Sequence, residues 1–325
     1  MNSRERNVYM DFLKGLAIIA VIVGHSLSNI QNANTLCNII YSFHMPLLIF
    51  ISAYVEEENK RKYEAKEHYM LLKRAQGLLI PYLSWTIIYE ILSGRLWTID
   101  IKNVSLQLFG YKQSGLWFLP VLFGLKFLHF LYWIIRRHRR SESIWIKDIL
   151  LCAFLEIGVA LLALLTKQPY IINMLSYAIP YFLAVVIVDY DVFRDIVNSE
   201  WVTASTFLIY MLLFPSFSFS HTQWTTQVIR IILALCVIII CCKFQGKWKI
   251  NWFYKILCLF GSNSMAIYVI HELLMDYAFY FDRINSASII AVLSILAAFI
   301  VAGVCIVIMR IIELSSWWKI ILFGK

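Results

Sequence analysis

Three ionisable side chains fall on one face of the first apolar stretch of the chain, where a membrane-spanning helix rarely carries charge. Asp11, Lys14 and His25 lie within or beside residues 12–30. At about 100° per residue, the eleven steps from Lys14 to His25 return to nearly the same helix face, about 16 Å further along the axis. Asp11 lies about 40° round from His25. One face of this helix thus carries a cation and an acid at its cytoplasmic end and an imidazole deep in the membrane, where it can act as a general base. For one histidine alone, the pattern favours a lysine that extends to the membrane surface and a buried, hydrogen-bonded structural histidine.

Two further histidines follow in later apolar stretches, and the orientation derived below places them at a depth similar to that of His25. His44 lies in residues 36–55, and His271 lies late in residues 256–279. Three imidazoles in the outer half of a membrane predict a polar cavity. Their spacing matches no zinc motif, and no pair of carboxylates lies beside them. We therefore expect no metal site.

A basic pair stands before the third apolar stretch. Lys73 and Arg74 precede residues 77–94 and are expected at the cytoplasmic edge of the membrane, at a depth near that of Lys14. Lysine and arginine in this position anchor many membrane proteins. The same side chains can also clamp the phosphates of a cytoplasmic cofactor.

The elements that hold these residues must be membrane helices, because the composition excludes the other classes. Hydrophobic residues make up 61% of the 325 residues and charged residues 15%, against roughly 45–50% and 25% in soluble domains. These values exclude a soluble enzyme, a disordered chain and a disulfide-rich secreted module, and they predict an all-α polytopic membrane protein. The seven cysteines form no CxxC pair and are interpreted as small apolar fillers. The net charge of +9 fits basic cytoplasmic loops better than a nucleic-acid-binding surface.

Ten apolar stretches predict ten transmembrane helices. They are residues 12–30, 36–55, 77–94, 115–135, 147–166, 170–189, 201–217, 225–242, 256–279 and 287–310. The first is interpreted as a retained helix rather than a signal peptide, because it carries Lys14 and His25 and has no clear cleavage site. With a cytoplasmic N-terminus, the inner segments hold 22 Lys and Arg and the outer segments hold 6. This bias predicts that both termini are cytoplasmic.

Residues 56–74 form the longest charged stretch and mix both signs. They are interpreted as a cytoplasmic helix that lies along the membrane and leads into the third span. The sequence contains no evident linker, repeat or soluble segment. Residues 1–325 are therefore expected to form a single integral-membrane domain.

Five blocks of the chain, in this order, resemble the integral-membrane acyltransferase 3 family. They are YMDFLKGLAIIAVIVGHSL (9–27), YSFHMPLLIFISAY (41–54), LKRAQGLLIPYL (72–83), GLWFLPVLF (115–123) and GSNSMAIYVIH (261–271). The FHMP stretch is most similar to the fucose 4-O-acetylase-like subgroup. The resemblance implies an acyltransferase that moves an acyl group, usually acetyl, from cytoplasmic acyl-CoA to a hydroxyl of an extracytoplasmic or lipid-linked saccharide. It also implies a multi-pass protein of a bacterial cytoplasmic (inner) membrane.

The resemblance assigns roles to the residues on the first helix. The family's first motif is a basic residue, ten further residues and a catalytic histidine, which Lys14 and His25 match. It thus implies that His25 is the general base. His44 is a candidate donor to the oxyanion that forms on the thioester. Asp11 and His271 complete the candidate catalytic set.

The same resemblance implies that basic residues bind the phosphates of acetyl-CoA, the expected acyl-donor substrate. Lys14, Lys73 and Arg74 are the candidates. The family's third-helix motif is Arg-x-x-Arg before a proline. Arg74 matches its first arginine, whereas Gly77 stands at the second position. Lys73 is a candidate substitute for the missing arginine.

Two other functional classes stay open at this point. A transporter or flippase for a small organic molecule or lipid-linked sugar also uses intramembrane histidines and acids as proton relays. Such transporters often contain inverted repeats, and none is detected here. A membrane sensor without chemistry is the third possibility. The acceptor and the oligomeric state are also left open by the sequence.

Overall fold

The computed structural model of the chain is built from helices, and no strand occurs among the residues that it describes. These are residues 7–28, 30, 34–60, 67–92, 105, 106, 108, 110, 115–138, 145–220, 224–244, 251–275, 281, 284 and 286–324. Within them, seven helices are long and apolar enough to cross a membrane, or eight if a bent pair counts as one span. The spans are Val8–Leu27, Thr35–Asn59, Phe118–Arg137, Trp145–Thr166, Pro169–Asp189, Thr225–Lys243 and Ala287–Ile312, and the bent pair is Trp252–Ser262 with Ser264–Met275.

Two of the ten predicted spans are not among these helices. Residues 77–90 of the predicted span 77–94 lie in α3 (Glu67–Glu90), which starts ten residues earlier and takes in the charged side chains before the apolar run, and residues 93 and 94 lie outside the described part of the chain. Residues 201–217 form α9 (Glu200–Leu213), followed by a short 3-10 helix. Fourteen residues of α-helix reach about 21 Å, short of the roughly 30 Å of a bilayer core. The ten-span topology and the cytoplasmic termini therefore stay predictions.

The interpretation of residues 56–74 as one surface helix is wrong at its start. Helix α2 runs over Asn34–Lys60 without a break and includes Glu56 and Glu57. Both of these glutamates are buried. The sequence predicted a surface location for these glutamates because they are charged. Buried partners can neutralise a carboxylate, and local sequence does not reveal such partners. Residues 61–66 lie outside the described part of the chain.

The chain divides into two compact units. The first contains residues 1–56 and 187–309, and the second contains residues 57–186 and 310–325. The expectation of one membrane domain over residues 1–325 stays a prediction.

The helices not yet named have the following bounds: α1 Val8–Leu27, α5 Phe118–His138, α6 Trp145–Thr166, α7 Pro169–Asp189, α8 Asp191–Asn198, α10 Trp224–Lys243, α11 Trp252–Ser262, α12 Ser264–Ile270, α13 Ala287–Ile312 and α14 Ser316–Phe323.

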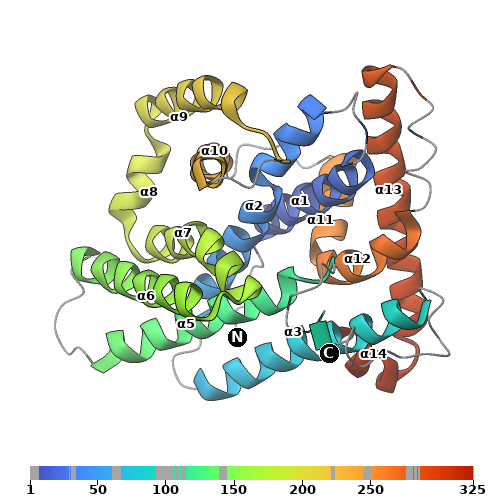
Figure 1. Cartoon of the computed structure of the whole chain (residues 1–325), viewed down its shortest axis with the longest axis horizontal. Coiled ribbons are helices and arrows are strands. Elements are labelled where there is room, and N and C mark those ends of the chain that lie inside the picture. Colours follow the sequence, from blue (N-terminus) through green and yellow to red (C-terminus); the bar gives the residue numbers. More distant parts are fainter. Residues whose placement is uncertain are drawn as a thin grey trace. The chain divides into compact units, whose positions relative to one another are not determined.

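In the first unit, α1 packs along α11 with the two backbones in direct contact (Figure 1). A Cβ atom at Gly15 would collide with the carbonyl oxygen of Leu257, and one at Gly261 would collide with the carbonyl oxygen of Asp11. Small residues allow membrane helices to approach this closely. Helix α1 begins at a cap, where Oδ1 of Asn7 accepts a hydrogen bond from the backbone N of Met10 at 3.3 Å. Its apolar residues are mostly buried, so α1 is an interior helix of this unit.

The predicted span 256–279 is broken rather than continuous. Helices α11 and α12 meet at Asn263 with a bend of 68°. Serine and asparagine favour helix ends because their side chains compete for backbone hydrogen bonds. Nδ2 of Asn263 donates to the carbonyl oxygen of Leu259 at 2.8 Å. The side chain thereby satisfies a carbonyl group at the end of α11.

In the second unit, α14 packs against α3. Nε1 of Trp85 donates to the carbonyl oxygen of Leu322 at 2.9 Å. Gly324 ends α14 with a φ of 64°, a left-handed conformation that favours glycine. A Cβ at Gly324 would collide with the backbone at Gln76 and Gly77, so glycine is required there on two grounds. Helix α6 exposes most of its apolar side chains, as expected for a surface that faces lipid.

Candidate active site

His25 of α1 and His271 at the C-terminal end of α12 lie side by side. Their ring centroids are 5.4 Å apart and the ring planes are tilted by 45°. Both histidines lie ten residues beyond a glycine of the α1–α11 contact, His25 beyond Gly15 and His271 beyond Gly261. From Gly15 to His25 the chain is continuous helix and spans about 15 Å, whereas the path from Gly261 to His271 contains the 68° bend at Asn263. The α1–α11 contact and this bend together bring the two imidazoles to the same level.

His44 of α2 belongs to the same cluster, since its imidazole interacts electrostatically with that of His25. A Cβ at Gly24 would come within 3.2 Å of the Tyr41 ring, so α1 and α2 are in close contact one residue before His25. The Tyr41 ring meets the imidazole of His44 edge to face, with centroids 4.9 Å apart. The structure thus brings together His25, His44 and His271, from three helices of one unit. We call these three residues the histidine cluster.

Backbone carbonyls fix the tautomers of the two buried members of the cluster. Nδ1 of His44 lies 2.8 Å from the carbonyl oxygen of Ile40. Nδ1 of His271 lies 2.7 Å from that of Tyr268. A carbonyl oxygen only accepts, so Nδ1 carries the proton in both rings, and Nε2 of each neutral ring is an acceptor. His44 can therefore donate to an oxyanion only when it is protonated, which argues against the donor role expected for its neutral form.

His25 differs from the other two histidines in exposure and in partners. It is half-buried, whereas His44 and His271 are buried. Within the described residues, no hydrogen bond to its imidazole occurs. Nε2 of His271 is also buried without a hydrogen-bond partner in that part of the chain. The cluster thus offers one accessible imidazole beside a second ring with an unused acceptor.

The remaining predicted site residues lie elsewhere along the helices. Asp11 is buried and Lys14 is half-buried near the start of α1, one to two turns into the helix. Lys73 is exposed and Arg74 is half-buried on α3, which belongs to the second unit. Lys14 shares the His25 face of α1 at a distance of about 16 Å along the axis. Among the described residues, no group of three or more His, Cys, Asp or Glu side chains could hold a metal ion.

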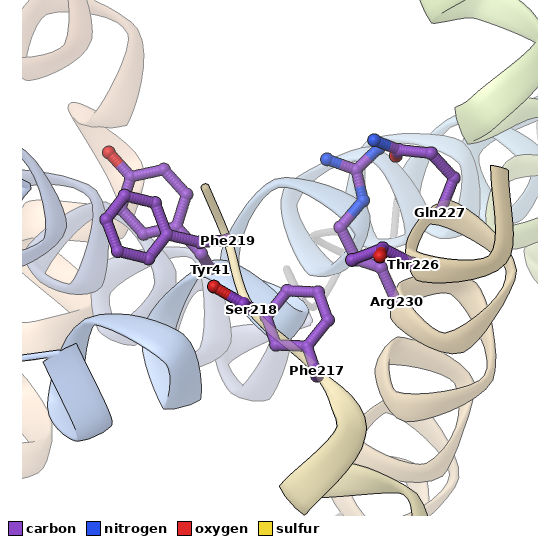
Figure 2. A pocket seen from close by; sticks show the side chains of 7 residues that line it. All are labelled: Tyr41, Phe217, Ser218, Phe219, Thr226, Gln227 and Arg230. Atoms are coloured by element: carbon purple, nitrogen blue, oxygen red, sulfur yellow. The ribbon is translucent and has the colours of Figure 1, made fainter. Parts of the chain in front are cut away.

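A pocket that sequence reasoning missed opens beside the histidine cluster (Figure 2). It lies between the segment after α9, the start of α10 and α2. In Figure 2 the rings of Tyr41 and Phe219 gather on one side and the side chains of Gln227 and Arg230 on the other. Phe217, Ser218 and Thr226 complete the lining. Arg230, six residues into α10, is the sequence signal that could have revealed the pocket, because charged residues inside spans mark functional cavities.

A fourth intramembrane histidine has a different environment, in the second unit. Nε2 of His129 lies 2.6 Å from Oε2 of Glu57. Nδ1 of the same ring lies 3.3 Å from the hydroxyl oxygen of Tyr181. The contact with Glu57 is an ion-pair contact, whereas Nδ1 and the tyrosine hydroxyl share a hydrogen bond, so both ring nitrogens lie against a side chain. We call these three residues the Glu57–His129–Tyr181 chain.

Comparison with known proteins identifies the family. The acyltransferase 3 family model, described as an acyltransferase domain, matches residues 7–311. The nodulation protein NolL of Sinorhizobium fredii (strain NBRC 101917 / NGR234) is 34% identical over 95 residues, which are 27% of this chain. The match covers 25% of that protein, so the chain aligns with about a quarter of the relative's length. No solved structure matches the chain. The family match spans nearly all of the chain, so the chain belongs to the acyltransferase 3 family, and several of its helices are long and apolar enough to cross a membrane.

Proposed function

We propose that the protein is a membrane O-acyltransferase that moves an acyl group, by preference acetyl, from cytoplasmic acyl-CoA to a hydroxyl of an extracytoplasmic or lipid-linked saccharide. The observation that carries this proposal is the ring pair of His25 and His271, at 5.4 Å, inside an acyltransferase domain. A bacterial cytoplasmic membrane and a likeness to the fucose 4-O-acetylase-like subgroup are part of the proposal. The match to a bacterial nodulation protein supports the bacterial setting.

In the proposed reaction, His25 is the general base. A ring nitrogen of His25 takes the proton of the acceptor hydroxyl while the hydroxyl oxygen attacks the thioester carbonyl. The carbon–sulfur bond then breaks, CoA leaves as a thiolate that collects a proton, and an ester remains on the acceptor. An imidazole suits this task because its ordinary pKa, about 6.5, lies near neutral pH. General-base catalysis of this kind contributes roughly 10²–10⁴-fold to the rate.

His271 is proposed to act through His25 as a positioning residue. Its Nδ1 is tied to the backbone of α12, so the ring is held in place. Its Nε2 is an acceptor that no described residue occupies. An adjacent acceptor stabilises an imidazole that gains a proton, as a carboxylate does in hydrolytic triads. Asp11 and His44 stay in the proposed site without an assigned step.

The donor is proposed to enter from the cytoplasmic side. Lys14, Lys73 and Arg74 are the candidates for its phosphates, because charge-assisted hydrogen bonds to phosphate are the strong ones. Lys14 supports this assignment by its position on the His25 face of α1. The acyl thioester would then have to reach about 16 Å along that face to meet His25.

The test uses purified protein in lipid vesicles, with acetyl-CoA and a panel of sugars. Thiol release and label transfer are measured for wild type and for His25→Asn, which keeps a polar side chain but loses the titrating ring. We expect transfer to fall about 10²–10⁴-fold while acetyl-CoA binding and the melting temperature are unchanged. Thr225→Ala, an exposed site on α10, is the matched control. Unchanged transfer by His25→Asn would overturn the assignment, and CoA-independent sugar flux would favour a transporter.

A further inference from the structure

The pocket beside the histidine cluster has two faces of different chemistry. One face is aromatic, with the rings of Tyr41 and Phe219 at a centroid distance of 4.9 Å. The opposite face carries the amide of Gln227 and the guanidinium of Arg230, with the hydroxyl of Thr226 beside them (Figure 2). Two apolar rings opposite several polar groups form a slot for a flat molecule that is apolar on its faces and polar at its edge.

The aromatic face is held in place before any ligand binds. The backbone N of Phe219 donates to Oδ1 of Asn38 at 3.0 Å, which ties the segment after α9 to helix α2. Asn38 lies three residues before Tyr41 on that helix, so both rings are positioned by α2. A preformed site binds with less loss of conformational freedom than one that must be ordered.

A sugar ring matches this chemistry. Its CH faces are apolar and pack against aromatic rings, whereas its hydroxyl groups both donate and accept hydrogen bonds at its rim. Gln227 offers donors and an acceptor, Thr226 offers both, and Arg230 offers five N–H donors.

The pocket adjoins the proposed catalytic residues. Tyr41 forms part of its wall and touches the imidazole of His44. Arg230 interacts electrostatically with His44, and His44 interacts with His25. All of these residues belong to the first unit. A sugar ring bound in the pocket is therefore separated from the histidine cluster only by the side chain of Tyr41.

We propose that this pocket is the acceptor subsite, in which one sugar ring packs against the Tyr41–Phe219 ring pair and its hydroxyls bond to Gln227 and Arg230. The inference rests on the proposed function, because it names where the acceptor of that reaction binds. In this arrangement the sugar being acylated, or its direct neighbour, is recognised as a single ring. Aromatic stacking sets its plane, and the polar face sets which hydroxyl turns toward His25.

The experiment separates acceptor recognition from the acyl-transfer chemistry. CoA release from acetyl-CoA is measured in vesicles with methyl glycosides of neutral, N-acetylated and uronic sugars, and with glycerol as a non-sugar alcohol. The best acceptor is then titrated against wild type, Phe219→Ala, Gln227→Ala and the control Thr225→Ala, whose exposed side chain is the neighbour of pocket residue Thr226. Acceptor-independent hydrolysis of acetyl-CoA and the melting temperature are recorded for each variant, with Phe219→Tyr as a conservative replacement.

We expect Phe219→Ala and Gln227→Ala each to raise the acceptor KM at least tenfold, with acceptor-independent hydrolysis unchanged. Phe219→Tyr and Thr225→Ala should stay within about twofold of wild type, since stacking by a tyrosine is equivalent. An unchanged acceptor KM in both alanine variants would overturn the subsite. Stimulation by glycerol alone would overturn the sugar-ring assignment but leave the transferase standing. A wild type that releases no CoA with any compound would instead overturn the proposed function, and the subsite with it.

Discussion

His25 in the first unit and His129 in the second are both histidines of apolar helices, but their partners differ. Both ring nitrogens of His129 meet side chains, at 2.6 Å from Glu57 and 3.3 Å from Tyr181. The imidazole of His25 has a ring contact with His271 and no hydrogen bond within the described chain. His129 is also fully buried, whereas His25 is half-buried.

The difference separates a structural histidine from one available for chemistry. A buried polar group with all its partners stabilises a fold and has no capacity left for a substrate. A partly exposed imidazole that makes no hydrogen bond to the described chain keeps its ring nitrogens available for water or a substrate. We therefore interpret the histidine cluster as a proposed substrate-binding site. We interpret the Glu57–His129–Tyr181 chain as a structural interaction that stabilises the second unit.

The largest loss of stability is expected when one partner of the Glu57–His129 pair is replaced. Glu57→Gln or His129→Gln alone leaves a buried partner unmatched, which costs about 3–5 kcal/mol for a buried pair. The double variant should recover part of this loss, with a coupling energy of about 1–3 kcal/mol. Chemical denaturation in detergent measures all three. Strictly additive losses would contradict the pairing of these two side chains.

A smaller loss of stability is expected at the glycine contact that aligns the histidine cluster. Gly15→Ala would place a Cβ against the backbone of Leu257, where no side chain can rotate away. Overpacking of this kind costs about 1–3 kcal/mol. Gly303→Ala on α13 is the control, because a Cβ there meets nothing within 4 Å. Equal melting temperatures for the two variants would show that the backbones of α1 and α11 do not set the alignment.

Two substitutions of His271 test whether its Nε2 or its Nδ1 matters for the positioning of His25, by comparison of their effects on kcat. Asparagine can place an amide where Nδ1 lies and keep the bond to Tyr268, whereas glutamine can place one where Nε2 lies. If Nε2 is the functional atom, His271→Asn should lower kcat about tenfold or more and His271→Gln should lower it less, with acceptor KM unchanged in both. The reverse order would mean that the bond to the carbonyl of Tyr268, and hence the local fold, is what matters.

The smallest effect is expected at Gly77, outside both histidine sites. A Cβ there meets no atom within 4 Å, so a larger side chain fits. Gly77→Arg would restore the second arginine of the third-helix motif that the family resemblance implies. We expect acetyl-CoA to bind about threefold to tenfold more tightly, as for one added charge-assisted hydrogen bond to a phosphate. Calorimetry with acetyl-CoA measures this, and Gly77→Gln is the uncharged control. Identical affinities for arginine and glutamine would remove α3 from the donor site.

The sequence was most informative where the chemistry depends on a single helix. The shared face of Lys14 and His25 follows from the helical period alone, and α1 is observed as a helix over both residues. The all-helical membrane class followed from composition. The sequence could not predict partners from distant helices. Glu57 was predicted to lie on the membrane surface, whereas it contacts His129, which is 72 positions later in the chain.

Hydropathy does not register where a helix breaks, as the predicted span 256–279 illustrates. The Gly-Ser-Asn-Ser run at 261–264 is short, yet it turns the chain by 68°. The pocket beside the histidine cluster was missed because three of its lining residues, 217–219, come from an irregular segment. Its attachment to α2 through Asn38 is a tertiary contact between residues 181 positions apart.

The most direct test of the comparison measures the same substitution at both histidines. His25→Asn and His129→Asn are purified side by side, and the rate of acyl transfer per folded molecule and the melting temperature are recorded for each. We predict that His25→Asn loses transfer by about 10²–10⁴-fold at an unchanged melting temperature. His129→Asn should melt at a lower temperature and keep its transfer rate per folded molecule. A His25→Asn variant that transfers acyl groups at the wild-type rate, or a His129→Asn variant that is stable but inactive, would contradict the account.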